Sequence, residues 1–395
     1  MSVRGPLAWL FGSLAAVGLL LALALRLERP APAAPVAAEL DVAAAMAGGD
    51  PSGFLRAEAP RDFDFPADHG AHDGFRTEWW YFTGNLRAPD GRTLGYQLTL
   101  FRNALAPARP EGGSDLRAQH VWMAHFALSD DRRGRFRFAE RLAREAIGLA
   151  GASSAPFRVW VEGWEAASTG DDFAPLRLRA AAEGMAIDLR LEAGKPPVAQ
   201  GERGLSRKGP EPGNASFYYS LTRLPTRGAV ELDGERFAVE GLSWMDREWS
   251  TSALGPDLAG WDWLALQLDD GRDLMLYRLR RRDGSADPWS AGAMVAADGT
   301  ARPLAARDFR LEPLGVWSSP RGGTYPAGFR IEVPTEGLVL EVRPRIADQE
   351  LATLVRYWEG AVSVAGSDAS GPVTGAGFLE MTGYAGAAQP LAASR

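Results

Sequence analysis

The sequence predicts an all-β fold of two tandem antiparallel β-barrels, and three observations carry this prediction. Short runs that alternate in side-chain type, such as residues 157–164 and 176–179, recur between clusters of Gly, Asp and Pro. Residues 176–190 align without a gap with 329–343, and both segments predict a hairpin around a Glu-Gly pair. Three further matches follow in the same order, which indicates a duplicated unit.

The supporting matches lie on both sides of the two hairpins. Each copy holds enough strands for a nearly closed antiparallel barrel, which removes exposed edges and has room for one small ligand. We expect the first barrel over 61–246 and the second over 247–388. Residues 138–149, charged and alanine-rich, predict a short connecting helix. The matches are 157–159 with 309–311, 79–81 with 261–263, and 218–219 plus 241–245 with 357–358 plus 377–381.

The amino terminus indicates export. Arg4 precedes an uncharged and mainly apolar run over 7–25, so residues 1–26 predict an apolar helix that serves as a cleaved signal peptide or a retained membrane anchor. Residues 27–60 are rich in Ala, Pro and Gly, which is typical of a tether. Both alternatives place the body in the periplasm or cell envelope.

Composition and motifs exclude several classes of function. A formal charge of -7 argues against a nucleic-acid binder, which needs a basic surface. The absence of cysteine excludes disulfides, thiolate metal sites and a cysteine nucleophile. The sequence contains no GxSxG elbow and no phosphate-binding loop. We interpret His69 and His72 as loop residues and not as a chelating pair. One of His120 and His125 is expected near a ligand. We expect neither a metal nor a cofactor.

Three tryptophan-rich clusters, at 77–85, 242–250 and 260–263, predict the functional site. Consecutive aromatics on a strand point to opposite faces, so these side chains cannot all fill one core. A carboxyl held against indole rings loses hydration and its pKa rises, which makes a neutral general acid. Asp246 is the expected proton donor. The expected lining residues are Glu78, Trp79, Trp80, Tyr219, Trp244, Glu248, Trp249, Trp261 and Trp263.

Two further points concern these acidic residues. In the alternative interpretation, Glu78 and Asp246 pair with Arg76 or Arg247 and only seal the junction between the copies. The copies also differ, because the second offers Glu380 and Thr382 in the region that aligns with Asp246.

These clusters resemble the AttH-like lipocalin-domain family, which is grouped with carotenoid 1,2-hydratases and often labelled as secreted hydrolases. The resemblance covers about residues 61–386 and implies two tandem lipocalin-like antiparallel β-barrels packed side by side. In the hydratases an aspartate is expected to protonate a terminal isoprenoid double bond, and water then captures the carbocation. Asp246 matches that acidic position. The motifs are EWWYFTGNL at 78–86, SFYYSLTRL at 216–224, LSWMDREW at 242–249 and GWDWLALQLDDGR at 260–272.

The resemblance therefore implies an exported protein that binds, and in the hydratase case modifies, an isoprenoid or other lipid-like molecule. The chain departs from the hydratases at 217–219, where they carry a His-x-Trp element, and at 244–246, where they carry Tyr-x-Asp. The alternative function is a non-catalytic lipid carrier or an accessory subunit of an envelope ABC transporter. A hydrolase would need an activated nucleophile, for which no motif is present.

Overall fold

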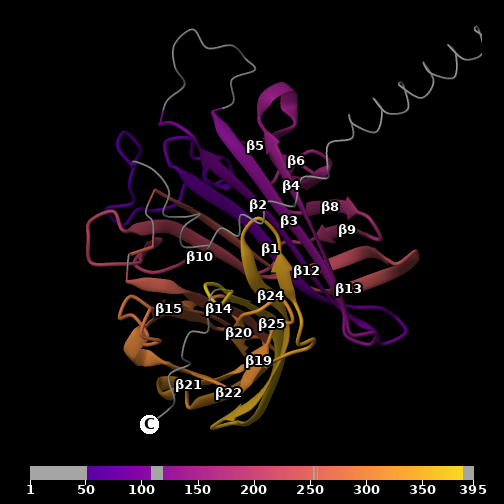
Figure 1. Cartoon of the computed structure of the whole chain (residues 1–395), viewed down its shortest axis with the longest axis vertical. Coiled ribbons are helices and arrows are strands. Elements are labelled where there is room, and N and C mark those ends of the chain that lie inside the picture. Colours follow the sequence, from indigo (N-terminus) through magenta and orange to yellow (C-terminus); the bar gives the residue numbers. More distant parts are fainter. Residues whose placement is uncertain (1–50, 108–118, 252–253, 256, 386–395) are drawn as a thin grey trace, which may run out of the picture. The chain divides into compact units, whose positions relative to one another are not determined.

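The computed structural model describes residues 51–107, 119–251, 254–255 and 257–385. The expected signal peptide or anchor over 1–26, and most of the expected tether over 27–60, lie outside the described residues. The described residues confirm the all-β prediction (Figure 1). None of the helical segments in those ranges combines the length and hydropathy that a membrane crossing requires.

The first barrel is one antiparallel sheet with the strand order β4-β3-β2-β1-β13-β12-β9-β8-β7-β6-β5. Strand β6 packs close to β2, β3 and β4, so the sheet curls into a nearly closed barrel. Two short strands, β10 (Val198–Ala199) and β11 (Leu205–Arg207), pair with β12. The main strands are β1 (Thr77–Arg87), β2 (Thr93–Ala104), β3 (His120–Asp130), β4 (Arg135–Arg144), β5 (Ala150–Ser154), β6 (Phe157–Val161), β7 (Trp164–Ser168), β8 (Leu176–Ala182), β9 (Met185–Leu191), β12 (Ala215–Leu232) and β13 (Glu235–Ser250).

The second barrel repeats this strand order as β17-β16-β15-β14-β25-β24-β22-β21-β18, with β23 paired to β24. Strands β14 to β17 take the places of β1 to β4, and β25, β24, β22 and β21 take those of β13, β12, β9 and β8, which confirms the duplication. The strands are β14 (Leu258–Leu268), β15 (Asp273–Arg281), β16 (Ala291–Val295), β17 (Ala301–Ala305), β18 (Arg310–Pro313), β21 (Phe329–Val333), β22 (Leu338–Pro344), β23 (Glu350–Ala352), β24 (Arg356–Asp368) and β25 (Gly371–Met381), with a separate hairpin of β19 (Val316–Ser318) and β20 (Thr324–Pro326).

The two Glu-Gly hairpins form as predicted, as β8–β9 and β21–β22. Gly184 and Gly337 adopt φ angles of 71° and 58° at these turns, a conformation that a side chain disfavours. Strand β13 continues to Ser250, past the expected division after Asp246, and β14 begins at Leu258.

The predicted helix over 138–149 is wrong. Most of it lies in β4, which pairs with β3 along its whole length, and only the single-turn 3-10 helix η2 (Ala146–Gly148) follows. The ladder of hydrogen bonds with β3 therefore outweighs the helical preference of this alanine-rich, charged segment, because local propensity is weak beside tertiary contacts. The other 3-10 turns are η1 (Ala67–His69), η3 (Ala306–Asp308) and η4 (Pro334–Glu336).

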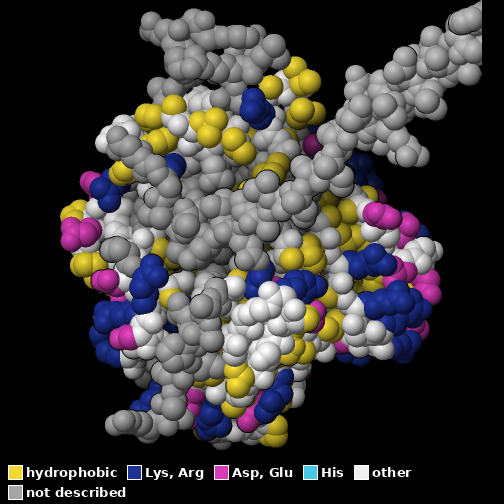
Figure 2. Space-filling view, viewed as in Figure 1, with side chains coloured by type: hydrophobic (Ala, Val, Ile, Leu, Met, Phe, Trp, Pro, Cys, Tyr) yellow, Lys and Arg dark blue, Asp and Glu magenta, His cyan; other side chains and the backbone are white. Residues whose placement is uncertain are grey.

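The barrels pack against each other through the outer faces of β1, β2, β12 and β13 and those of β14, β24 and β25 (Figure 1). The Gln267 side chain crosses this junction and donates hydrogen bonds to the carbonyls of Thr222 and Ser243 at 2.7 and 3.0 Å. Gly95 allows the close approach, because a Cβ there would lie 2.6 Å from Cβ of Ala361. On the face drawn in Figure 2, basic and acidic side chains are interspersed, so the net charge of -7 is not gathered there.

Alternation along β13 decides which side chains enter the first core. Met245 and Trp249 point into that core, whereas Trp244 joins an apolar cluster between the barrels. Asp246 and Glu248 share the outward face with Trp244 because side chains two residues apart lie on one face. The junction cluster consists of Tyr81, Tyr218, Trp244, Leu258, Trp263, Ala265, Met275, Tyr277, Leu279, Ala361 and Phe378.

Candidate functional site

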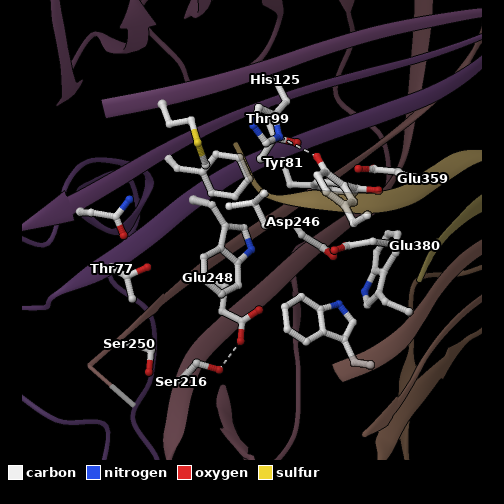
Figure 3. A pocket seen from close by; sticks show the side chains of 18 of the residues that line it. Thr77, Tyr81, Thr99, His125, Ser216, Asp246, Glu248, Ser250, Glu359 and Glu380 are labelled. Carbon is white, nitrogen blue, oxygen red and sulfur yellow. Dashed lines mark hydrogen bonds between the residues drawn. The ribbon is translucent and has the colours of Figure 1, made fainter. Parts of the chain in front are cut away.

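A cavity of about 360 Å³ lies between the outer faces of the two barrels, large enough for a small organic ligand (Figure 3). Leu142 and Leu354 line it and are 50% and 38% exposed, so the cavity reaches solvent beside them. Most of its wall is apolar, and polar groups converge at a few points. The aromatic lining residues are Trp79, Tyr81, Phe101, Tyr218, Trp261, Trp263, Tyr277 and Tyr357.

Asp246 presents its carboxyl to this cavity and is 3% exposed. On its Oδ1 it accepts hydrogen bonds from Ser220 Oγ at 2.5 Å and Trp244 Nε1 at 2.7 Å. On Oδ2 it accepts one bond from Tyr218 Oη at 2.6 Å. A carboxylate offers about four lone-pair sites, so Oδ2 keeps one that can carry a proton.

The environment of Asp246 gives its carboxyl an unusually high pKa. Burial raises the pKa of Asp246 to about 7, the three hydrogen bonds pull the pKa down, and the charge of Glu248 raises it further. A carboxyl with that pKa can hold and release a proton at neutral pH, which is the property of an efficient general acid.

Glu248 faces the same cavity two residues further along β13. Ser216 donates a hydrogen bond to its Oε1, and Lys208 Nζ lies 3.5 Å from that oxygen. The Lys208 ammonium also lies 3.9 Å from the ring centroid of Tyr277. Burial alone would lower the pKa of Lys208, but Glu248 and Tyr277 raise it, so the lysine carries its charge and compensates Glu248.

A second acidic group enters the cavity from the second barrel. Glu359 on β24 and Glu380 on β25 occupy directly opposite positions of one ladder, so their side chains share a face. Burial raises the pKa of both carboxyls, and the charge of Glu380 adds to the rise at Glu359. Trp261 donates a hydrogen bond to Glu380. The hydroxyls of Tyr81 and Tyr357 interact with the Glu359 carboxyl. Among the described residues, neither the buried Glu359 Oε1 nor the buried Tyr81 Oη makes a hydrogen bond of ordinary length and angle.

His125 and Tyr357 complete the wall next to this pair. His125 Nδ1 lies 2.7 Å from Tyr357 Oη, and its Nε2 lies 3.0 Å from Glu140 Oε1. His120 lies outside the cavity lining and contacts Glu145 through Nδ1 at 2.5 Å. Of the two histidines that flank Trp122, only His125 therefore lines the cavity.

The structure divides the residues predicted for the site into two groups. One group lies at the cavity, because it occupies the outward faces of β1, β13 and β14. The other group lies inside the first barrel, because it occupies the opposite face of β1, β12 and β13. The cavity group is Trp79, Asp246, Glu248, Trp261 and Trp263, with Trp244 in contact with Asp246. The interior group is Glu78, Trp80, Tyr219 and Trp249.

Glu78 belongs to a buried ion cluster and is not a lining residue. Arg102 and Arg247 both form salt bridges with its carboxylate, and the backbone N–H of His72 donates to both carboxylate oxygens at 3.1 Å. Burial alone would raise the pKa of Glu78, but the two arginines hold it well below its usual range. The pairing with Arg247 is thus the alternative that the sequence offered, although it forms inside the barrel and not at the junction.

His69 and His72 close the end of the first barrel from the segment before β1. The His72 ring stacks on Trp249 with 3.7 Å between centroids, and His69 Nδ1 lies 2.6 Å from Tyr219 Oη. Burial, with the nearby Arg247, lowers the pKa of His69 to about 3, so its ring is neutral. In the part of the chain that the structure describes, no three His, Asp or Glu side chains are placed to hold a metal ion.

The two copies are unequal at Asp246. The same Asp-Gly-Arg turn closes the β1–β2 and β14–β15 hairpins, which places Tyr81 and Trp261 at equivalent positions. The predicted match of 79–81 with 261–263 is therefore wrong by two residues. Tyr81 pairs with Asp246, whereas the carbonyl of Trp261 accepts a hydrogen bond from the N–H of Thr382. Thr382 therefore stands in the second barrel where the first has Asp246.

Sequence reasoning missed several groups that contact the acidic residues. Tyr218 and Ser220 flank the predicted Tyr219 on β12, and the two-residue period of a strand could have placed both on the face opposite to it. Glu359 directly follows the Tyr357-Trp358 pair that marked the repeat. Lys208 had no local signal, because it lies outside the strands.

Comparisons with known proteins agree with this architecture. The model of the AttH-like family matches residues 56–384. A solved structure assigned to AttH, from Nitrosomonas europaea, is 35% identical, with 82% of this chain and 99% of that chain covered and a TM-score of 0.72. Kievitone hydratase from Nectria haematococca is 16% identical, with 83% and 97% covered and a TM-score of 0.62, which shows a shared fold. No curated protein matches the chain.

Proposed function

The chain belongs to the AttH-like family, and on that premise we propose that it binds an isoprenoid or other lipid-like molecule between its barrels and hydrates a carbon–carbon double bond in it. The observation that carries the proposal is the buried Asp246 carboxyl, whose pKa lies at about 7 in a cavity with aromatic walls. One structural neighbour is named a hydratase, and we extend that reaction class to this chain as part of the proposal.

Asp246 acts as the proton donor in this scheme. Its proton sits on Oδ2, where one lone pair is uncommitted, and passes to one carbon of the double bond. Ser220 and Trp244 then stabilise the carboxylate that remains. The aromatic faces of the cavity stabilise the positive charge on the other carbon. Water adds to that carbon and loses a proton, so one molecule of water is added in all.

The ligand class follows from the wall of the cavity. Its lining is largely aromatic and aliphatic, which favours a hydrophobic ligand with few polar groups. We include in the proposal a periplasmic or cell-envelope location, on the strength of the apolar run over 7–25. A lipid-like substrate would be at hand in that compartment.

A second candidate is a non-catalytic lipid carrier or an accessory subunit of an envelope ABC transporter. Tyr218 bonds both Asp246 and Trp263, so Asp246 also takes part in joining the barrels, a role that needs no chemistry. Co-purification with a permease, together with unchanged transport by an Asp246→Asn variant, would favour this candidate.

The test of hydration begins with mass spectrometry of lipids extracted from the natively purified protein, which selects a panel of acyclic isoprenoids. The panel is incubated with enzyme in oxygen-18 water, and labelled alcohol is measured. Asp246→Asn should form at least about 100-fold less alcohol, the usual scale for loss of a general acid. Asp188→Asn, which changes a half-exposed carboxyl on β9, is the matched control. Equal alcohol formation by Asp246→Asn and wild type would reject the proposal.

A further inference from the structure

The proton donation assigned to Asp246 leaves a second acidic group of the cavity unused. Glu359 and Glu380 face each other across the β24–β25 ladder, and Glu359 is 1% exposed. Two carboxylates side by side repel each other in a buried site, so such a pair retains a proton. Both carboxyls line the cavity.

Two buried polar atoms, one on Glu359 and one on Tyr81, point to a bound molecule. The hydroxyls of Tyr81 and Tyr357 both interact with the Glu359 carboxyl. Among the described residues, however, neither Glu359 Oε1 nor Tyr81 Oη, which are both buried, makes a hydrogen bond of ordinary length and angle. The two side chains lie close together, because the charge of Glu359 and a loose hydrogen bond between them both raise the pKa of Tyr81. A buried polar atom without a partner is costly, so a small polar molecule between these groups would satisfy both.

The pair also lies beside the proposed proton donor. Figure 3 shows Asp246 and Glu380 extending toward one another from the two barrels, and the charge of Asp246 raises the pKa of Glu380. Tyr81 stands directly opposite Asp246 in the β1–β13 ladder. Of the other ionisable groups that line the cavity, Glu248 is compensated by Lys208, and His125 is hydrogen-bonded to Tyr357.

We propose that the Glu359–Glu380 pair is the base of this cavity, which holds the attacking water together with Tyr81 and accepts the proton of that water. The inference rests on the proposed hydration and adds a second catalytic group to it. Glu359 Oε1 and Tyr81 Oη are the two atoms that bind the water.

The proton balance closes within the cavity. In the reactive form Asp246 carries one proton and the pair shares another; because burial raises the pKa of Glu380 to about 8, above that of Asp246, this form is a minor one at neutral pH. Asp246 gives its proton to a carbon of the double bond, and the water oxygen forms a bond to the cationic carbon. The water proton passes to the pair, which is then neutral. Transfer of one proton from the pair back to Asp246 restores the starting state, and nothing is oxidised or reduced.

The first test separates protonation of the alkene from capture by water. Glu359→Gln and Glu380→Gln are incubated with the acyclic isoprenoid panel in deuterated water and, separately, in oxygen-18 water. We expect labelled alcohol to fall at least about 100-fold while deuterium still enters recovered alkene, because Asp246 can protonate reversibly without a base for the water. Glu341→Gln, a half-exposed glutamate on β22, is the control. A parallel loss of both labels, or no loss of either, would overturn the assignment.

The second test needs no turnover. A tertiary amine analogue, with its ammonium where the cation would form, is compared by calorimetry with a neutral analogue of the same shape. At pH 9, above the pKa of about 8 of Glu380, the charge on the pair should make the amine bind tighter, and Glu359→Gln should weaken its binding at least about tenfold. Equal affinity for wild type and Glu359→Gln would contradict a charged base there. The affinity for the amine tests the charge of the Glu359–Glu380 pair even if Asp246→Asn disproves the hydration.

Discussion

Trp263 Nε1 donates a hydrogen bond to Tyr218 Oη at 3.1 Å, which links the second barrel to the first. Tyr218 donates in turn to Asp246 Oδ2 at 2.6 Å. The phenol therefore accepts from one barrel and donates within the other. Contact between the barrels thus fixes the Tyr218 hydroxyl as the donor in its hydrogen bond to Asp246.

Tyr218→Phe tests this relationship through the pH dependence of catalysis. The hydrogen bond from Tyr218 favours the carboxylate, so its loss should raise the pKa of Asp246 above about 7. The acid form would then persist to higher pH, and the alkaline limb of kcat/KM should move upward. Tyr325→Phe, which removes a buried phenol bonded to Glu350 in the second barrel, is the control. A limb that stays in place or moves down would contradict the prediction.

Substitutions of Lys208 and of Glu248 should shift the alkaline limb of kcat/KM in opposite directions. Lys208→Gln leaves the Glu248 charge uncompensated, which should raise the pKa of Asp246, because negative charge nearby disfavours its ionisation. Glu248→Gln removes a charge that raises this pKa, so the limb should move down. The double variant should fall between them. Shifts of the same sign in both single variants would show that the charge of Glu248 does not act on Asp246.

The duplicated fold could be predicted from the sequence because its signals are local. A Glu-Gly turn between alternating runs defines each hairpin without reference to the rest of the chain, as the β8–β9 and β21–β22 pairs show. The prediction of a helix over 138–149 failed for the opposite reason. Most of this segment pairs with β3, and local sequence preference does not report such a long-range interaction.

The candidate site was harder to predict from the sequence, because Glu78 and Asp246 have similar sequence surroundings. Both are acids among tryptophans, but the face that each takes depends on which side of the sheet becomes the core. Arg102 and Arg247, from β2 and β13, make Glu78 an interior ion. Only the packing of the second barrel makes Asp246 a cavity residue, and no local pattern reports that packing.

Glu78→Gln should therefore act on stability and not on chemistry. It removes one partner of a fully buried ion cluster and leaves Arg102 and Arg247 uncompensated, which typically costs about 3–5 kcal/mol in the free energy of unfolding. Urea unfolding should show this loss, while Glu341→Gln, at a half-exposed pair, should change stability by less than about 1 kcal/mol. The alkaline limb of kcat/KM should stay in place for the folded variant. A displaced limb would return Glu78 to the catalytic site.

The raised pKa of Asp246 also predicts how stability depends on pH. The unfolded carboxyl ionises near its usual 3.8 but the folded one only at about 7, so stability is full below about pH 4 and is lost as pH rises to about 7. Glu78 has a lowered pKa and is ionised in both states above pH 5, whereas His69, lowered to about 3, acts in the opposite sense below 6.5. The difference between wild type and Asp246→Asn cancels Glu78 and His69, because their pKa shifts do not involve Asp246. The raised pKa values of Glu359 and Glu380 keep that pair protonated in both folded proteins up to about pH 7. That difference in unfolding free energy should fall by about 1.4 kcal/mol per pH unit between pH 5 and 7 and then level off. A difference that is constant from pH 5 to 8 would mean that Asp246 is ionised in the folded protein throughout, and that it cannot be the proton donor.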